Sequence, residues 1–387
     1  MFHARSALVL TLSLALATPA AANDTGAFVV RLGQDTTGCE HYARTDSHLD
    51  IEQVGRAPRV LNRHITYDFG KGGAVSKMTF TVTSPSAPAG SKPVQVVNAT
   101  FTADSVMLET RRDTTVQRDH FAVPSGTVVI TGASPWSIYE IETMKLAKQK
   151  PDSLQANLYY VGAPNLASIT LRRLGKDSVA IQTTNDLYHV RVDKTGQILN
   201  VVPIVGTAKF SVDRVASLDF AGMTAGFVAR EQSGGQMGLL SPRDTVRATV
   251  AGASMWVDYS RPSKRGRAIF GGVVPWSIVW RTGANAATQF HTDKALQFGS
   301  QTLAAGTYTL WTLPSPTGWK FIVNSETGQW GTAHKPEKDM FSVDMKVSTL
   351  PASVEKFTIG IESGAGGGTL NLDWDTTRAS VPFTVAP

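Results

Sequence analysis

The segment HITYDFGKGGAVSKMTFTV, residues 64–82, decides the fold class. Apolar and polar residues alternate on both sides of GKGG at 70–73, and a period of two is typical of β-strands that bury one face. The glycines give the backbone the freedom that a tight turn requires. The segment therefore predicts an antiparallel β-hairpin.

Short alternating segments of the same kind recur through the first half of the chain. Residues 187–204, LYHVRVDKTGQILNVVPI, repeat the hairpin pattern with Gly196 in the turn. One exception is WSIYEIETMKLAK at 136–148, whose apolar residues recur at helical spacing after Pro135, a typical helix start. We therefore expect residues 23–235 to form a curved antiparallel sheet with one covering helix.

A polar, glycine-rich stretch, AREQSGGQMG at 229–238, predicts the junction between two domains. Alternating segments resume after it, from TVRATV at 245–250 to ASVPFTV at 379–385. They predict about nine short strands separated by turn signals. Residues 236–387 are thus expected to form an antiparallel β-sandwich or jelly-roll, which makes the whole protein mainly β.

The first 22 residues have the pattern of a secretory signal peptide. Arg5 precedes an apolar run from Ser6 to Ala17, and Ala20 and Ala22 form an Ala-x-Ala cleavage motif. The run is shorter than the roughly 20 apolar residues that span a bilayer, and no later segment is long enough. We expect an exported protein, periplasmic or extracellular, without a transmembrane segment. Cys39 lies too far beyond the cleavage site to be lipidated.

Composition narrows the class of partner. The chain has 387 residues, 42% of them hydrophobic, one cysteine and a formal net charge of +6. A single cysteine excludes an internal disulfide, and the apolar content suffices for hydrophobic cores. The positive charge is modest and spread along the chain, which together with export argues against nucleic acid as the partner. No sequence pattern indicates a cofactor.

The most distinctive local feature is SRPSKRGRAIFGGVVPWSIVWRTGAN at 260–285. It holds five cations and no Asp or Glu, interleaved with aromatic residues, glycines and prolines: Arg261, Lys264, Arg265, Arg267 and Arg281. These cations require distant carboxylates, backbone carbonyls, water or a ligand anion as partners. A solvated charge run would not carry so many large apolar residues, so the segment is expected to have a fixed shape.

Two interpretations of this segment stay open. In the functional one, three arginines bind a carboxylate, phosphate or sulfate, Trp280 stacks against a sugar or ring, Asn285 orients the ligand, and Trp330 adds a wall. The candidate ligand-binding residues are then Arg261, Arg267, Trp280, Arg281, Asn285 and Trp330. In the structural one, the guanidinium groups are tied to backbone carbonyls.

The second half of the chain also resembles a known family. The matching residues are SPRDTV at 241–246, VDYSRPSKRGRAIFGGVVPWSIVWRTGAN at 257–285, LAAGTYTLWTLP at 303–314 and GQWG at 328–331. From Leu240 to Val385 they are similar to the bacterial family called domain of unknown function 2911. The resemblance implies an exported β-rich domain and brings no activity. The N-terminal half loosely resembles exported curved β-sheet domains.

Catalytic and metal-binding patterns are weak. Ser353–Lys356 spells S-x-x-K, but the companion K-T-G at 194–196 precedes it, which is the wrong order for a serine acyl-enzyme. Asp373 and Asp375 share a strand face but cannot alone complete a metal shell. We expect no catalytic residues and no metal site.

The favoured hypothesis is a non-catalytic binding or envelope-associated protein for an anionic small molecule or glycan. The alternatives are a hydrolase acting on an envelope or extracellular polymer, and a structural or assembly module.

Overall fold

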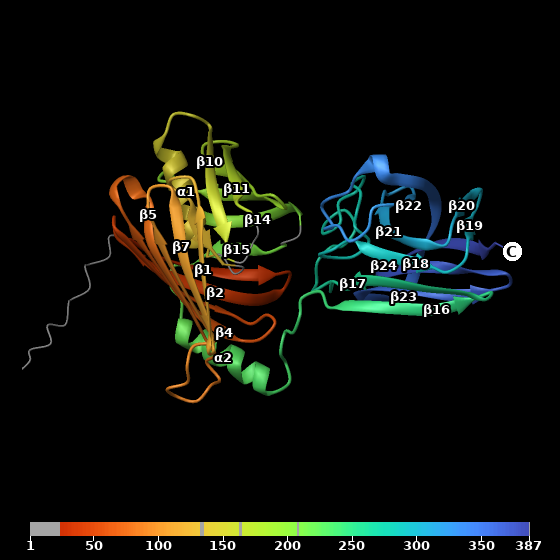
Figure 1. Ribbon diagram of the computed structural model, residues 1–387, viewed down its shortest axis with the longest axis horizontal. Coiled ribbons are helices and arrows are strands. Elements are labelled where there is room, and N and C mark those ends of the chain that lie inside the picture. Colours follow the sequence, from red (N-terminus) through yellow and green to blue (C-terminus); the bar gives the residue numbers. More distant parts are fainter. Residues whose placement is uncertain (1–23, 132–134, 162–164, 207–208, 387) are drawn as a thin grey trace, which may run out of the picture.

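The computed structural model contains two β-rich halves joined by a single connecting segment (Figure 1). It describes residues 24–131, 135–161, 165–206 and 209–386. The predicted signal peptide, residues 1–22, lies outside the described residues. No helix in these ranges is long and apolar enough to cross a membrane.

The N-terminal half is a 15-stranded sheet with the order β8-β7-β6-β5-β4-β3-β2-β1-β15-β14-β13-β12-β11-β10-β9. Two up-and-down meanders meet where β1 pairs with β15. Every pair is antiparallel except β9 with β10, which is parallel. The strands are β1 (Asp24–Leu32), β2 (Asp35–Arg44), β3 (His48–Gly55), β4 (Leu61–Phe69), β5 (Val75–Thr83), β6 (Gln95–Phe101), β7 (Ser105–Arg112), β8 (Thr115–Ala122), β9 (Val128–Ile130), β10 (Ser153–Tyr160), β11 (Ala167–Arg173), β12 (Ser178–Gln182), β13 (Asp186–Val192), β14 (Ile198–Gly206) and β15 (Ser211–Arg214).

The hairpin predicted at 64–82 is confirmed as β4 and β5. Ile65 faces Phe80 across the ladder and Tyr67 faces Met78, and all four side chains are buried on the inner face. A short 3-10 turn, Lys71–Gly73, joins the strands, and Gly72 has the positive φ of 77° that favours glycine. The alternation that identified the hairpin therefore also defines which face of the sheet meets the core.

The predicted helix is also confirmed, as α1 (Trp136–Lys148). Trp136, Ile138 and Leu146 pack into the core on the inner face of the curved sheet. The start of the helix is capped from outside: the Glu40 carboxylate on β2 accepts from the backbone amides of Trp136 at 3.0 Å and Ser137 at 2.8 Å. These two amides have no hydrogen-bond acceptor within the helix, so a carboxylate distant in the sequence satisfies them.

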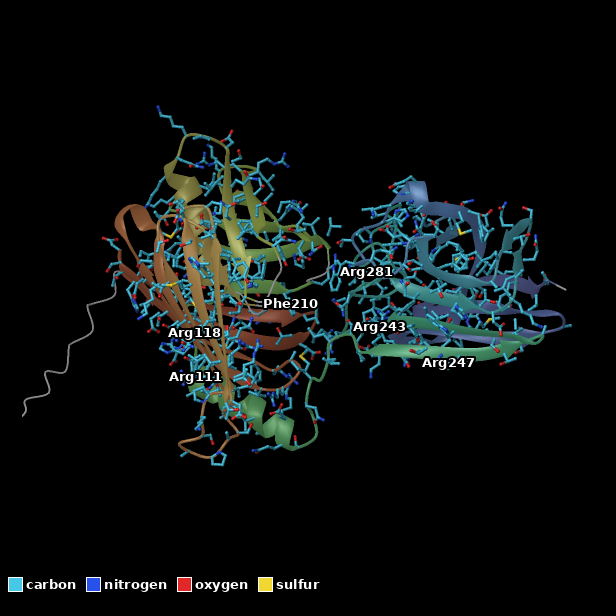
Figure 2. All side chains as sticks on the ribbon, in the orientation of Figure 1. Arg111, Arg118, Phe210, Arg243, Arg247 and Arg281 are labelled. Carbon is cyan, nitrogen blue, oxygen red and sulfur yellow. The ribbon has the colours of Figure 1, made fainter. Side chains whose placement is uncertain are left out.

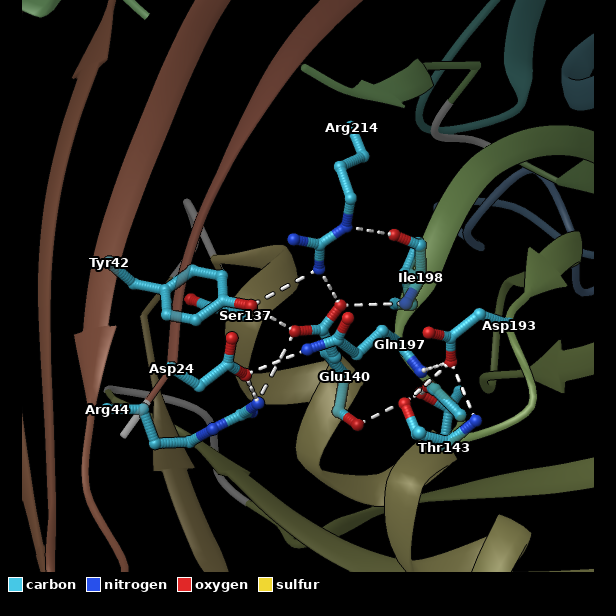
Figure 3. A network of polar contacts seen from close by, with 12 residues as sticks. Asp24, Tyr42, Arg44, Ser137, Glu140, Thr143, Asp193, Gln197, Ile198 and Arg214 are labelled. Carbon is cyan, nitrogen blue, oxygen red and sulfur yellow. Dashed lines mark hydrogen bonds and ion pairs between the residues drawn. The ribbon is translucent and has the colours of Figure 1, made fainter. Parts of the chain in front are cut away.

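A second buried carboxylate holds the middle of α1 against the sheet (Figure 3). Glu140 is fully buried and accepts from the Tyr42 hydroxyl, from Arg214 and, at 2.7 Å, from the backbone amide of Ile198. The partners come from β2, β15 and β14, so the network links one helix to three strands.

Another helix, α2 (Phe220–Gln232), was not predicted. Its N-cap Asp219 accepts from the Gly222 amide at 2.8 Å, and the helix covers the outer face of the sheet through Phe227. Cys39 is buried beneath it, and burial raises the pKa of its thiol to about 12. The expectation of a single covering helix is therefore incomplete. Residues 229–232 of the predicted linker belong to α2.

The C-terminal half is a nine-stranded antiparallel sheet with the order β16-β17-β18-β21-β22-β23-β24-β19-β20. It folds over as the predicted sandwich around its own core, with Trp374, Phe321 and Phe357 at the centre. Its strands are β16 (Arg243–Val250), β17 (Ala253–Ser260), β18 (Thr288–Thr292), β19 (Leu296–Phe298), β20 (Gln301–Leu303), β21 (Gly306–Leu313), β22 (Trp319–Asn324), β23 (Asp339–Gly364) and β24 (Gly367–Val385), with a 3-10 turn at Pro336–Lys338.

Two details of the expected strand list are wrong. The alternating segments FSVDMKV at 341–347, EKFTIGIE at 355–362, TLNLDWD at 369–375 and ASVPFTV at 379–385 predict four separate strands. They form two long strands, β23 and β24, because shifts in register let β23 continue through residues 349–358. The short strands β19 and β20 were not predicted. Residues 339–345 of β23 pair with β22 and residues 346–364 pair with β24, so this strand links the two parts of the sandwich.

Candidate functional site

The two halves meet at the basic segment, residues 260–285, which connects β17 to β18. The Gln34 amide of the N-terminal half donates to the Arg265 carbonyl at 3.1 Å, and the Arg265 guanidinium pairs with Asp35 at 2.6 Å. The backbones approach closely here: a Cβ added to Gly33 would lie 2.2 Å from the Arg265 oxygen. The segment is thus fixed on the N-terminal sheet.

A second contact between the halves is centred on Arg281 (Figure 2). Its guanidinium donates to the carbonyl of Gly206 at 3.1 Å, across the junction, and to the carbonyl of Asn285 at 3.4 Å. The Thr332 hydroxyl donates to the Asn185 side-chain oxygen at 2.8 Å beside it. Arg281 therefore supports the junction as well as facing the space next to it.

Between these contacts lies a cleft of about 710 Å³, which we call the interdomain cleft. This volume is within the range of small-molecule sites, and sites of that kind are common between domains. Residues from both halves line it, including Pro58, Asp186, Gly206, Lys209, Phe210, Leu239, Arg267, Val273, Ile278, Trp280, Arg281, Asn285, Trp311 and His334.

Positive charge dominates the lining. Lys209, Arg267 and Arg281 face the cleft, whereas Asp186 is the one carboxylate among the described residues that line it. Burial lowers the pKa of Lys209 to about 8, the Arg281 charge lowers it as well, and Asp186 opposes the shift. Burial also lowers the pKa of Arg267 and of Arg281. The cleft is therefore an electropositive site with partly desolvated cations.

The cations of the basic segment differ in their partners. Arg261 pairs with Asp244 at 2.9 Å, and Lys264 pairs with Asp375 at 2.6 Å. Arg267 instead donates to the carbonyls of Lys264 at 3.0 Å and Ser263 at 2.6 Å. Distant carboxylates thus neutralise Arg261 and Lys264, and backbone carbonyls hold Arg267, which faces the cleft.

Four of the six predicted ligand-binding residues line the interdomain cleft: Arg267, Trp280, Arg281 and Asn285. Arg261 is held outside it by Asp244, the carbonyl of Phe357 and the hydroxyl of Thr358. Trp330 is 43% exposed and pairs by its backbone with Ala286. The structure therefore brings part of the predicted set together.

The two tryptophans of the lining are largely buried. Trp280 is 8% exposed, stacks on Trp374 with a centroid distance of 6.0 Å, and donates to the Gly283 carbonyl at 3.0 Å. Little of its ring is left to stack on a ligand. Trp311 is 1% exposed, and its indole N–H has no acceptor among the residues the structure describes. The indole N–H is therefore a buried donor without a described acceptor, which is uncommon in folded proteins.

Lys209, Asp186 and Ile278 were not predicted as site residues. Lys209 and Asp186 belong to the N-terminal half, about 50 and 75 positions before the basic segment. No local motif connects them with it, because the cleft exists only after the two sheets pack. Ile278 lies inside the basic segment, where its apolar side chain between two tryptophans was a readable signal.

The remaining motifs form ionic clusters. Ser353 lies within β23 rather than in a loop, and its hydroxyl donates to Asp375 at 2.8 Å, with Lys264 at 3.5 Å. The ion pair with Lys264 lowers the pKa of Asp375. Asp373 has a separate partner, Arg378, at 2.7 Å. Within the described ranges, no group of three or more His, Cys, Asp or Glu is placed to hold a metal.

The fold is that of a mainly β protein with two β-rich halves and a cation-rich cleft at their junction. Residues 241–383 match the family model DUF2911, a protein of unknown function, which confirms the family resemblance of the C-terminal half. No curated protein matches the sequence.

Two solved structures are similar at low identity. A DUF1089 family protein from Pseudomonas aeruginosa is 11% identical, with a TM-score of 0.32, over 43% of this chain and 90% of that one. A β-barrel-like protein of domain of unknown function DUF1849 from Brucella abortus is 9% identical, with a TM-score of 0.34. The match covers 49% of this chain and 94% of that one.

Proposed function

We propose that this protein is an exported, non-catalytic binding protein whose interdomain cleft holds a small anion with an apolar body. One observation supports this above the others: three cations from both halves face the cleft, against one carboxylate among the described lining residues. Export rests on the signal-peptide pattern of residues 1–22.

The electrostatic argument starts from Lys209. Its ammonium donates to the Ile204 carbonyl at 3.3 Å and has no ion pair with a described carboxylate. Burying a cation is costly, and the cost rises with two arginines nearby; Asp186 offsets only part of it, because the pKa of Lys209 is still lowered. A bound anion would remove this penalty, so its binding should be favourable and should stabilise the folded protein.

The apolar part of the ligand is inferred from the walls of the cleft. Leu239 is 65% exposed and Ile278 46% exposed, although both are large hydrophobic residues. Together with Pro58 and Val273 they give the cleft an apolar side next to its cationic one. Exposed apolar surface of this kind marks a binding site for apolar groups. The small exposed area of Trp280 makes a stacked glycan the less favoured ligand.

The test uses isothermal titration calorimetry with octanoate and octyl sulfate, and octyl glucoside as the uncharged comparison. Wild type should bind both anions more tightly than the glucoside. The double variant Lys209→Met/Arg267→Met should lose about tenfold or more in affinity, because charge-assisted hydrogen bonds are the strong ones.

Lys320→Met is the matched control. It removes one cation from an exposed ion pair on β22, away from the cleft. Its affinity for the anions should equal that of wild type. A wild type that binds neither anion, or equal losses in control and double variant, would contradict the proposal.

A further inference from the structure

The inner face of the N-terminal sheet carries an arginine where the alternation expects a core residue. Arg63 lies on β4 with the same parity as Ile65 and Tyr67, which are each 1% exposed. Successive side chains of a strand point to opposite faces, so Arg63 points inward with these two. It is directly opposite Gln53 on β3 and Val82 on β5.

Arg63 has no partner within the described part of the chain, either as an ion pair or as a hydrogen bond. Burial lowers the pKa of its guanidinium, and no neighbouring carboxylate offsets the shift. Arg214, on the same inner face, is paired with the buried Glu140, and Arg44 is paired with Asp24. These two arginines are paired with carboxylates, whereas Arg63 is paired with none of the described residues.

Arg63 faces a cavity of about 500 Å³, which we call the Arg63 chamber. Its walls come from opposite parts of the curved sheet and from α1: Gln53, Arg63, Trp136, Tyr139, Tyr160 and Tyr188. Trp136 packs edge-on to Tyr188 with a centroid distance of 5.4 Å. The chamber therefore has a cation on one side and an ordered aromatic wall on the other.

Further polar atoms around the chamber lack partners. The side-chain oxygen of Gln53 is buried and accepts no hydrogen bond from any described residue. The hydroxyls of Tyr160 and Tyr188 also line the chamber and make no hydrogen bond with a described residue, but they are not among the buried atoms that lack a partner. Buried polar groups are normally satisfied, so the unsatisfied Gln53 oxygen, opposite the unpaired Arg63, indicates a missing molecule with polar atoms.

We propose that the Arg63 chamber is a second binding site, which takes a small carboxylate attached to a flat unsaturated ring. The carboxylate lies on the fork of Arg63, whose paired N–H groups match it. The ring packs against Trp136 and Tyr188. Ala57, Asp186, Phe210 and Leu240 line both cavities, so the chamber adjoins the interdomain cleft. Its own cation and aromatic wall belong to the N-terminal sheet, so this site does not rest on the ligand proposed for the cleft.

The experiment uses ¹⁹F NMR with 4-fluorobenzoate as the probe and 4-fluorobenzamide as its uncharged match. Wild type should bind the benzoate, and the benzamide about tenfold more weakly, because it lacks the charge that pairs with Arg63. Arg63→Met should lose about tenfold in benzoate affinity, and Arg63→Lys should lie between, since it keeps the charge without the fork.

The cleft variant Lys209→Met/Arg267→Met separates this inference from the proposed function. It should bind 4-fluorobenzoate within about twofold of wild type while losing octanoate. If it loses both probes equally, or if octanoate displaces the benzoate one for one, the anion is in the cleft and the chamber proposal is wrong. A wild type that does not bind the benzoate at millimolar concentration also overturns it.

Stability without ligand gives an independent readout. Arg63→Met removes a half-buried cation that has no partner among the described residues, so its melting temperature should equal or exceed that of wild type. A guanidinium with a structural role would give the opposite result. An Arg63→Met protein that unfolds or melts early, with Arg63→Lys restoring the melting temperature but not changing benzoate affinity, would show that Arg63 serves the fold and would overturn the proposal.

Discussion

Gly331 packs directly against the side chain of Arg281: a Cβ added to this glycine would lie 2.2 Å from Arg281 Cδ and 2.5 Å from the Asn285 carbonyl oxygen. Arg281 crosses the junction to Gly206. The absence of a side chain at position 331 therefore sets the position of the guanidinium in the interdomain cleft.

Gly331→Ala should displace Arg281 and destabilise the protein by about 1–3 kcal/mol, the usual effect of overpacking. Octanoate affinity should fall with it. Urea unfolding and calorimetry measure both. Gly360→Ala is the control, because a Cβ there meets no atom within 4 Å. A Gly331→Ala protein with unchanged stability and affinity would show that Arg281 has room to move.

Lys209 should react with amine reagents at unusually low pH. Its pKa of about 8 leaves half of the amine neutral at pH 8, whereas an ordinary lysine titrates near 10.4. Acetic anhydride labelling followed by peptide mass spectrometry should give a rate that levels off above about pH 8–9. Octyl sulfate should protect the residue if it binds in the cleft. A labelling rate that keeps rising to pH 10 would contradict the lowered pKa.

Glu40 should make stability depend on pH in an unusual direction. Burial raises the pKa of its carboxyl from 4.5 to about 7, although the amides of Ser137 and Trp136 oppose the shift. The folded state therefore holds the proton more tightly than the unfolded state. The contribution of Glu40 to stability is greatest below pH 4.5 and is lost as pH rises through 7.

Glu40→Gln removes this titration. The difference in unfolding free energy between wild type and variant should fall by about 2–3 kcal/mol from pH 5 to pH 8, because each pKa unit corresponds to about 1.4 kcal/mol. Urea titrations of both proteins at the two pH values give this difference. The contributions of the other carboxylates to the pH dependence are the same in both proteins and cancel in the difference. A difference that stays constant with pH would mean that Glu40 is ionised in the folded protein throughout.

The sequence predicted the parts of the fold that depend on local pattern. The alternation at 64–82 and the helical spacing of Ile138 and Ile141 were sufficient for β4, β5 and α1. The pattern did not predict α2, because Gly222 and Gly226 each destabilise a helix by about 1 kcal/mol. Packing of the helix on Val54 and Cys39 compensates for this loss in the folded protein. Such tertiary compensation is not visible in a single segment.

The candidate site was predictable only in part, for a related reason. The basic segment is contiguous, so Arg267 and Arg281 could be selected from it. The residues on the N-terminal side of the cleft could not be predicted, because Lys209 becomes a neighbour of Arg281 only when the two sheets pack together. Arg63 was detectable in principle: it has the parity of Ile65 and Tyr67, and a charged residue at an inward position of a strand is a readable signal.

We propose a domain boundary immediately after α2, which limited proteolysis can locate. Gly234 and Gly238 have positive φ, and Leu239 is 65% exposed. Exposed connections of this kind are the preferred sites of cleavage. A protease of broad specificity should cut between 233 and 241 and leave a stable C-terminal fragment that starts there. Early cleavage inside either sheet would contradict the boundary.

Glu140 should be essential for holding α1 in place. It is fully buried, and its loss leaves Arg214 and the Tyr42 hydroxyl without their partner (Figure 3). Breaking a buried ion pair from one side typically costs about 3–5 kcal/mol. Glu140→Met should therefore lower stability by an amount in that range and weaken the near-ultraviolet circular dichroism of Trp136, which is on the same helix.

A double variant tests whether the uncompensated charge is the cause. Glu140→Met/Arg214→Met removes both charges and should be more stable than Glu140→Met alone, because no buried guanidinium is left unpaired. Glu109→Gln, in the exposed pair with Arg118, serves as the comparison and should change stability little. If the double variant is less stable than Glu140→Met by the full effect of Arg214→Met alone, the two residues act independently, and the network contributes by packing rather than by charge.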